Sequence, residues 1–262
     1  MSLYTENIER WKMLSDVDYF TQFVKTWVCF NAWYKTSFPD LKTDRAAIEH
    51  IKNTNNKVKN EILKHLNNDY PENKKFKSFI GELHHRLESK YVHNKGNRIS
   101  FREICIEENI KKREERSFNR ISYRAERDVV IATGKVIETE ILNSRNVRQF
   151  HFQQAKYSFN EIEVLPNFLA LDTNWQRSLR IVYEDINPYK PICLTVEADS
   201  RDKIEVGGVF FANDKDKICK GIITVLYAIR NVLFHGEIVP DKETNRVYEP
   251  AFQMLKMIIE SL

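Results

Sequence analysis

Apolar residues repeat at intervals of three and four near both ends of the chain, which places them on one face of a helix. The first stripe follows Asp16, a helix-capping residue, and stops before Pro39. The last strong stripe follows Asn213 and Asp214 and stops at Gly236, a residue typical just past a helix C-terminus. The stripe residues are Phe20, Phe23, Val24, Trp27, Phe30 and Tyr34 in the first and Ile218, Ile222, Val225, Leu226, Ile229 and Leu233 in the last. We therefore expect a long amphipathic helix at each place.

Three further helices are predicted around these two. One begins at Thr43 or Asp44 and can break across residues 53–56, which are polar and poor helix formers. Another follows Pro71, because proline is favoured in the first turn of a helix. The last spans roughly 248–261, where apolar residues again recur at helical spacing.

The middle of the chain is less regular. A helix is predicted through 116–146, although the β-branched stretch 129–142 also suits a pair of strands. Residues 191–212 are predicted to be extended around a turn at Gly207-Gly208. The chain holds only 7 glycines and 7 prolines in 262 residues, which favours long helices over a turn-rich β fold. We therefore predict a mainly α protein whose middle region is helical or mixed and can include a small β element.

Charge and cysteine content narrow the function classes. The net charge of +4 permits a nucleic-acid partner without requiring one. No run of about 18 apolar residues occurs, and the N-terminus lacks the apolar core of a signal peptide, so neither a membrane span nor secretion is expected. The four scattered cysteines include no CxxC pair, so we expect no zinc site and reduced thiols in a cytoplasmic protein.

The sharpest chemical pattern is Arg230-Asn231-Val232-Leu233-Phe234-His235, near the end of the last strong stripe. Five helical steps bring Arg230 and His235 within roughly 140° of each other. Asn231 and His235 are i,i+4 neighbours on one face. A guanidinium can stabilise charge on a phosphoryl group, and an imidazole can transfer a proton near neutral pH. The simpler alternative is a surface arginine and a helix-end cation that favourably meets the helix dipole.

This hexapeptide resembles the Arg-polar-x3-4-His motif of HEPN domains (higher eukaryotes and prokaryotes nucleotide-binding). The flanks extend the resemblance, since LYAIRNVLFHGE is followed by a polar loop and a closing helix. The stretch FVKTWVCFNAWY is similar to the aromatic helix of the HEPN families allied to Apea-like domains. The resemblance covers residues 16–93 and 213–262. It implies N-terminal bundle helices in 1–93, an insertion of unknown fold in 94–212, and the motif and closing helices in 213–262.

The resemblance also implies an activity. In catalytic HEPN proteins two motif helices meet in a dimer and form one metal-independent site that cleaves RNA. The 2′-hydroxyl attacks the adjacent phosphorus, leaving a 2′,3′-cyclic phosphate. Carried over to this chain, Arg230 would stabilise the phosphorane, His235 would act as general acid or base, and Asn231 would orient the phosphate or the imidazole. Glu237 stands two residues after the histidine, where HEPN domains with antitoxins often carry tyrosine, so nucleotidylation there is not implied.

The biological setting implied is prokaryotic defence or toxicity, with RNA as substrate, a homodimer as the active form, and an antitoxin or defence-system protein as partner. No cofactor is expected. The competing hypothesis is a non-catalytic HEPN-like module that binds RNA, a nucleotide or a protein. Fold resemblance alone does not separate the two, because function depends on the site.

A second cationic feature follows from spacing alone. Residues 111–127 contain seven basic and three acidic side chains. Five arginines spaced by three and four would fall within about 80° on a helix and could follow a phosphate backbone. These predicted RNA-binding residues are Arg113, Arg116, Arg120, Arg124 and Arg127. The alternative is a solvated face partly neutralised by neighbouring glutamates.

A metal site is not expected from the histidines. His84, His85 and His93 do not share a helical face, and no cysteine near them completes a ligand set.

Overall fold

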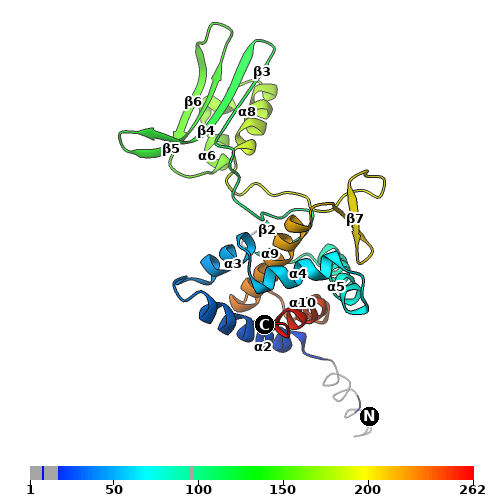
Figure 1. The fold of residues 1–262 in the computed structure, drawn as a ribbon. Coiled ribbons are helices and arrows are strands. Elements are labelled where there is room, and N and C mark those ends of the chain that lie inside the picture. The colour runs from blue at the N-terminus through cyan, green and yellow to red at the C-terminus, as the bar shows by residue number, and fades with distance from the viewer. Residues whose placement is uncertain (1–7, 9–16, 95–96) are drawn as a thin grey trace. The chain divides into compact units, whose positions relative to one another are not determined.

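Two compact units make up the chain in the computed structural model, which describes residue 8, residues 17–94 and residues 97–262. The terminal unit combines Met1–Ile106 with Ile192–Leu262, and the inserted unit is Glu107–Pro191 (Figure 1). Each unit has its own hydrophobic core. The chain leaves and re-enters the terminal unit at adjacent points, because Ile104 and Ile192 exchange two backbone hydrogen bonds.

Helices dominate the terminal unit. They are α2 (Tyr19–Ser37), α3 (Asp44–Asn53), α4 (Lys57–Asn67), α5 (Pro71–Ser89), α9 (Lys215–Phe234) and α10 (Lys242–Ile259). Helix α10 packs against α2 and α5, while α9 packs against α3 and α4. The buried Tyr248 hydroxyl donates to the carbonyl oxygen of Ile229 at 2.8 Å and so joins α10 to α9. The helices predicted for both ends of the chain are confirmed and form one core.

Capping residues define several helix starts. Thr43 caps α3 and Asn56 caps α4, which confirms the break predicted across 53–56. Asp18 caps α2 by accepting from the backbone N–H of Thr21, whereas Asp16 lies outside the described residues. The last helix begins earlier than predicted, because Asp241 supplies a cap that accepts from Thr244.

Two short hairpins accompany these helices. One pairs β1 (His93–Asn94) with β2 (Asn97–Arg98), and the other pairs β7 (Lys203–Val206) with β8 (Val209–Ala212). Gly207 and Gly208 form the β7–β8 turn with φ of 60° and 81°, which confirms the predicted turn. A Cβ on Gly207 would lie 2.0 Å from the carbonyl oxygen of Lys77, so only glycine lets this hairpin meet α5.

The inserted unit is a four-stranded antiparallel sheet with helices on one face (Figure 1). Its elements are β3 (Arg113–Phe118), β4 (Ile121–Ile131), β5 (Gly134–Leu142), β6 (Arg148–Gln154), α6 (Phe159–Glu163), α7 (Pro166–Leu169) and α8 (Thr173–Asp185). The strands lie in the order β3-β4-β5-β6, and α8 packs on β4. Alternate residues such as Tyr123, Ala125 and Ile141 are buried in the core with Leu179 and Tyr183 of α8. Asp172 caps α8.

The mainly α prediction is wrong. The protein is mixed α/β, with 49% helix, 20% strand, the four-stranded sheet and the two small sheets. The helix predicted through 116–146 is replaced by β3, β4 and β5. The low glycine content does not exclude hairpins in this chain. Asn119, Arg120 and Asn146 adopt positive φ at hairpin turns, where glycine is usual. The alternative of strands in 129–142 is confirmed.

Two further observations bear on the expected setting. No helix in the described part of the chain is long and apolar enough to cross a membrane. All four cysteines carry free thiols, of which Cys29 and Cys193 are exposed and Cys219 is buried.

Candidate functional site

The C-terminus of α9 presents the Arg230–His235 segment. Helix α9 ends at Phe234, and His235 is the C-cap residue. Gly236 follows with φ of 67°, and its N–H donates to Leu233 while the N–H of Glu237 donates to Val232. This is the Schellman pattern, which confirms the terminating role predicted for Gly236. The helix end is therefore a defined structure that fixes where the His235 backbone lies.

The guanidinium of Arg230 is held from several sides. Nη2 donates to Oδ2 of Asp44 at 3.0 Å, and Nη1 donates to Oδ1 of Asn231 at 3.0 Å. The guanidinium carbon lies 4.4 Å from the ring centroid of Phe234 and 5.9 Å from that of Trp27. The Arg230 side chain is 15% exposed. Its position is thus fixed by hydrogen bonds and ring contacts while one edge still reaches solvent.

Asp44 is an acidic partner that sequence reasoning missed. It is the first residue of α3, after the Thr43 cap, where a carboxylate favourably meets the helix dipole. Lys35, in the last turn of α2, lies 3.4 Å from its other carboxylate oxygen. Burial and the nearby Asp44 carboxylate raise the pKa of Tyr34. Asp44 is 186 residues from Arg230 along the chain, so no local pattern marks the pair.

Asn231 and His235 have different surroundings. The Asn231 amide accepts from Arg230, so it orients the guanidinium rather than the imidazole. The His235 backbone N–H donates to the Asn231 carbonyl oxygen at 2.9 Å. The His235 side chain is exposed and makes no hydrogen bond or ion pair with a residue that the structure describes. The last turns of one helix therefore carry an anchored guanidinium and, five residues later, an exposed imidazole.

The five predicted RNA-binding arginines do not form a helical ridge. Arg113 and Arg116 lie in β3, Arg124 and Arg127 lie in β4, and Arg120 lies in the turn between these strands. The predicted helix is absent because arginines spaced by three and four here lie on the β3–β4 hairpin. The helix is a wrong prediction, while RNA contact by these residues stays a prediction.

Four of these arginines have acidic partners. Arg113 pairs with Glu115 and Glu126, Arg116 with Glu114 and Asp185, Arg124 with Glu115 and Glu140, and Arg127 with Glu108. Hydrogen bonds from the Arg113, Ser122 and Arg124 side chains lower the pKa of Glu115 to about 2. Arg127 is nearly buried and its guanidinium also donates to the Lys111 and Asn109 carbonyl oxygens, so it has a structural role. These contacts neutralise most of the positive charge that the sequence pattern indicates.

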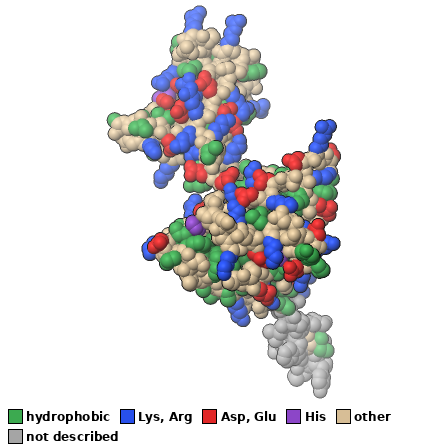
Figure 2. All heavy atoms as spheres, in the orientation of Figure 1, with side chains coloured by type: hydrophobic (Ala, Val, Ile, Leu, Met, Phe, Trp, Pro, Cys, Tyr) green, Lys and Arg blue, Asp and Glu red, His purple; other side chains and the backbone are tan. Residues whose placement is uncertain are grey.

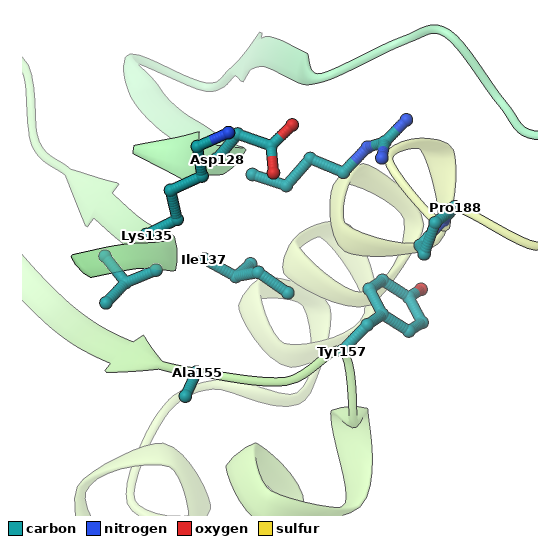
Figure 3. A pocket seen from close by; sticks show the side chains of 8 residues that line it. Asp128, Lys135, Ile137, Ala155, Tyr157 and Pro188 are labelled. Atoms are coloured by element: carbon teal, nitrogen blue, oxygen red, sulfur yellow. The ribbon is translucent and has the colours of Figure 1, made fainter. Parts of the chain in front are cut away.

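A small pocket lies at one end of the inserted sheet, with a volume of about 160 Å³ (Figure 3). Its lining residues are Arg127, Asp128, Lys135, Val136, Ile137, Ala155, Tyr157 and Pro188. The Lys135 side chain extends toward Asp128, and the Tyr157 ring faces the pocket near Pro188 (Figure 3). Asp128 already pairs with Lys112 at 2.8 Å. The pocket is small, and its Arg127 and Asp128 side chains already have ion-pair partners, so it is a weaker candidate than the end of α9.

The histidines that the structure describes do not gather into a metal-binding set. His84 is buried in α5, and its ring lies 5.5 Å from that of His85. Within the described residues, no three histidine, cysteine or acidic side chains are placed to hold a metal ion.

Comparisons with known proteins return no relative. No family model matches the chain, and neither the curated proteins nor the solved structures include a match.

Proposed function

We propose that this protein is a metal-independent endoribonuclease of the HEPN type that acts as a homodimer. The observation that carries the proposal is the end of α9, where an anchored, partly exposed Arg230 precedes an exposed His235 by five residues. Anchoring favours catalysis, because a guanidinium already in place does not lose orientational freedom when charge develops on the phosphate. The substrate class and the dimer rest on the family resemblance.

The proposed reaction is an intramolecular displacement at phosphorus. The ribose O2′ forms a bond to phosphorus while the bond from phosphorus to O5′ of the next nucleotide breaks. One imidazole takes the O2′ proton, and an imidazolium from the second copy gives a proton to O5′. Arg230 stabilises the negative charge on the non-bridging oxygens. The products are a 2′,3′-cyclic phosphate and a 5′-hydroxyl, and no metal is needed.

We further propose a cytoplasmic role in prokaryotic defence or as a toxin, restrained by an antitoxin or a defence-system partner. RNA cleavage inside a cell requires restraint, which gives such a partner its function.

The test is incubation of the purified chain with RNA in EDTA, followed by analysis of the fragment ends. We expect cyclic phosphate ends, with cleavage reduced at least about 100-fold in His235→Ala and in Arg230→Ala. Arg230→Lys should also lose activity, because an ammonium keeps the charge but not the planar fork that contacts Asp44 and Asn231. His93→Ala and Arg246→Ala change exposed residues of the same types and serve as controls. Cleavage that survives both alanine substitutions at the site would refute the mechanism.

A second candidate function is binding without catalysis, in which a module of the same fold binds RNA, a nucleotide or a protein. The observation that favours it is the Asp44 carboxylate, which already neutralises Arg230 in the monomer. This function predicts no cleavage by the dimeric wild-type chain in either EDTA or Mg²⁺, together with measurable ligand binding.

A further inference from the structure

Two hairpin tips of the inserted unit lie at the same end of its sheet. One tip, residues 119–120, joins β3 to β4, and the other, residues 143–147, joins β5 to β6. The central strands pair Ser122 with Leu142, immediately below both tips. Figure 1 shows the two loops at this one end, opposite the turn that joins β4 to β5. Because adjacent strands are about 4.8 Å apart, the tips lie on the order of 10 Å from each other.

The two tips themselves carry no acidic residue, although Arg116, Arg124 and Arg148 below them pair with Glu114, Glu115, Glu140 or Asp185. Residues 116–124 contain three arginines and residues 141–150 contain two, and neither stretch contains an aspartate or glutamate. Arg120 and Arg145 are exposed and, unlike the other arginines nearby, have no ion pair with any residue that the structure describes. Lysine or arginine side chains project from this end in Figure 2. An anion can therefore approach these two arginines without displacing a carboxylate.

Apolar side chains accompany the two free cations. Phe118 is 63% exposed beside one tip, and Val147 is 53% exposed in the other. An exposed phenylalanine next to arginines can stack on a nucleobase while the arginines contact phosphates.

The backbone at Arg120 is a separate observation that points the same way. Asn119 and Arg120 have φ of 49° and 64°, so this two-residue turn has both central residues in the left-handed region. Turns of this kind favour Asn-Gly, because a Cβ is strained there. Here arginine occupies the glycine position, and its exposed side chain makes no ion pair that would offset the strain. A side chain at a left-handed position that makes no ion pair within the fold motivates the hypothesis that it contacts a ligand.

We propose that this end of the sheet, named here the arginine tips (Phe118, Arg120, Arg145 and Val147), binds the phosphate backbone of single-stranded RNA. The inference rests on the proposed ribonuclease for its choice of ligand, and it gives the inserted unit the role of holding the substrate. It replaces the predicted helical ridge with a different surface, which retains only Arg120 of the original five residues.

The test measures binding separately from cleavage. The full-length chain carrying His235→Ala is titrated in EDTA against a fluorescent single-stranded RNA oligonucleotide at several salt concentrations. We expect Arg120→Gly and Arg145→Gln each to weaken binding several-fold and to reduce the slope of log K against log salt by about 0.7, the value for one lost phosphate contact on a single strand. Phe118→Ala should weaken binding several-fold with little change in slope, because stacking releases no counterion.

A matched control and a stability readout separate binding from folding. Lys156→Gln removes one exposed positive charge beyond the far end of β6 and should leave both the affinity and the slope unchanged. Arg120→Gly should raise the melting temperature, because glycine relieves the left-handed strain, so its weaker binding cannot result from a damaged fold.

Three results would overturn the inference. These are unchanged affinity and slope in both arginine variants, an equal loss in Lys156→Gln, or Arg120-dependent binding to anionic lipid vesicles without binding to RNA. A chain that cleaves RNA but binds it equally well in the tip variants refutes this inference alone. A chain that binds RNA through the tips yet never cleaves it supports the inference and refutes the proposed ribonuclease.

Discussion

At the scale of single residues, the Arg230–Asp44 pair decides how the proposed site can work. Arginine has five N–H donors, and Asp44 and Asn231 each accept from only one of them in this structure. The buried Nε has no hydrogen-bond partner among the described residues. One N–H on each of Nη1 and Nη2 therefore remains for a phosphate while the plane of the guanidinium is fixed; the buried Nε does not face solvent. We interpret Asp44 as a positioning residue that acts through Arg230.

Asp44→Asn tests this interpretation. Loss of the carboxylate charge should strengthen RNA binding, because Arg230 is no longer neutralised, yet it should lower the single-turnover cleavage rate about tenfold, because the guanidinium is less well oriented. The free energy of unfolding should fall by about 1–2 kcal/mol as a partly buried charged hydrogen bond is weakened. Lys35→Gln, which removes the more exposed neighbour of Asp44, is the control and should change the cleavage rate little. Equal losses of affinity and rate in Asp44→Asn would instead indicate a merely structural role.

At the scale of elements, the β7–β8 hairpin shows how a turn is specified by what it packs against. Gly207 and Gly208 both need positive φ, but only Gly207 meets the α5 backbone. A Cβ on Gly81 of α5 would likewise lie 1.9 Å from the Gly207 carbonyl oxygen. The hairpin and the helix therefore approach through glycine on both sides.

Substitution of the two turn glycines should lower the free energy of unfolding by different amounts. Gly207→Ala should lower the free energy of unfolding by more than about 2 kcal/mol, because left-handed strain adds to a clash with the Lys77 carbonyl. Gly208→Ala should cost about 1 kcal/mol, since it has strain but open space around it. Urea unfolding of both variants measures the difference. Equal costs would show that the approach to α5 adds nothing.

At the scale of the whole molecule, burial of histidines makes the terminal unit sensitive to acid. His65 is buried, its Nδ1 accepts from the Asn73 amide nitrogen Nδ2 at 2.9 Å, and its ring stacks on Phe76. Burial lowers the pKa of His65 from its ordinary 6.5, although Glu61 opposes the shift. Burial also lowers the pKa of His84, with Glu88 in opposition. In both cases the folded state takes up a proton less readily than the unfolded state.

The sign of the pH dependence follows from these lowered pKa values. Below pH about 6.5 the unfolded chain binds protons at these histidines while the folded chain does not, so stability falls as pH falls. The free energy of unfolding, measured in urea from pH 7.5 to 5.5, should decrease by up to about 1.4 kcal/mol per pH unit for each histidine. The double variant His65→Gln, His84→Gln should flatten the decrease, while His93→Gln should not. A wild-type stability that is constant across this range would contradict the prediction.

Local sequence determined much of the terminal unit. Polar caps at Thr43, Asn56 and Asp214, apolar spacing and Gly236 specify helix starts, faces and ends through contacts within a few residues. The Gly207-Gly208 turn was equally readable, because positive φ at two successive residues favours glycine. The structure around the arginines of 113–127 could not be predicted in this way. Their spacing suits a helix as well as a hairpin, and the turn between the strands lacks glycine.

Only the tertiary structure decided which charged groups meet. Asp44 reaches Arg230 across 186 residues, and carboxylates from separate strands neutralise Arg113 and Arg124. Such pairs depend on how helices and strands pack, which leaves no periodic trace in either segment. Strand pairing likewise determines which arginines of the described residues have no acidic partner. The proposed RNA-binding surface therefore lies at the ends of two hairpins and not on the predicted helix.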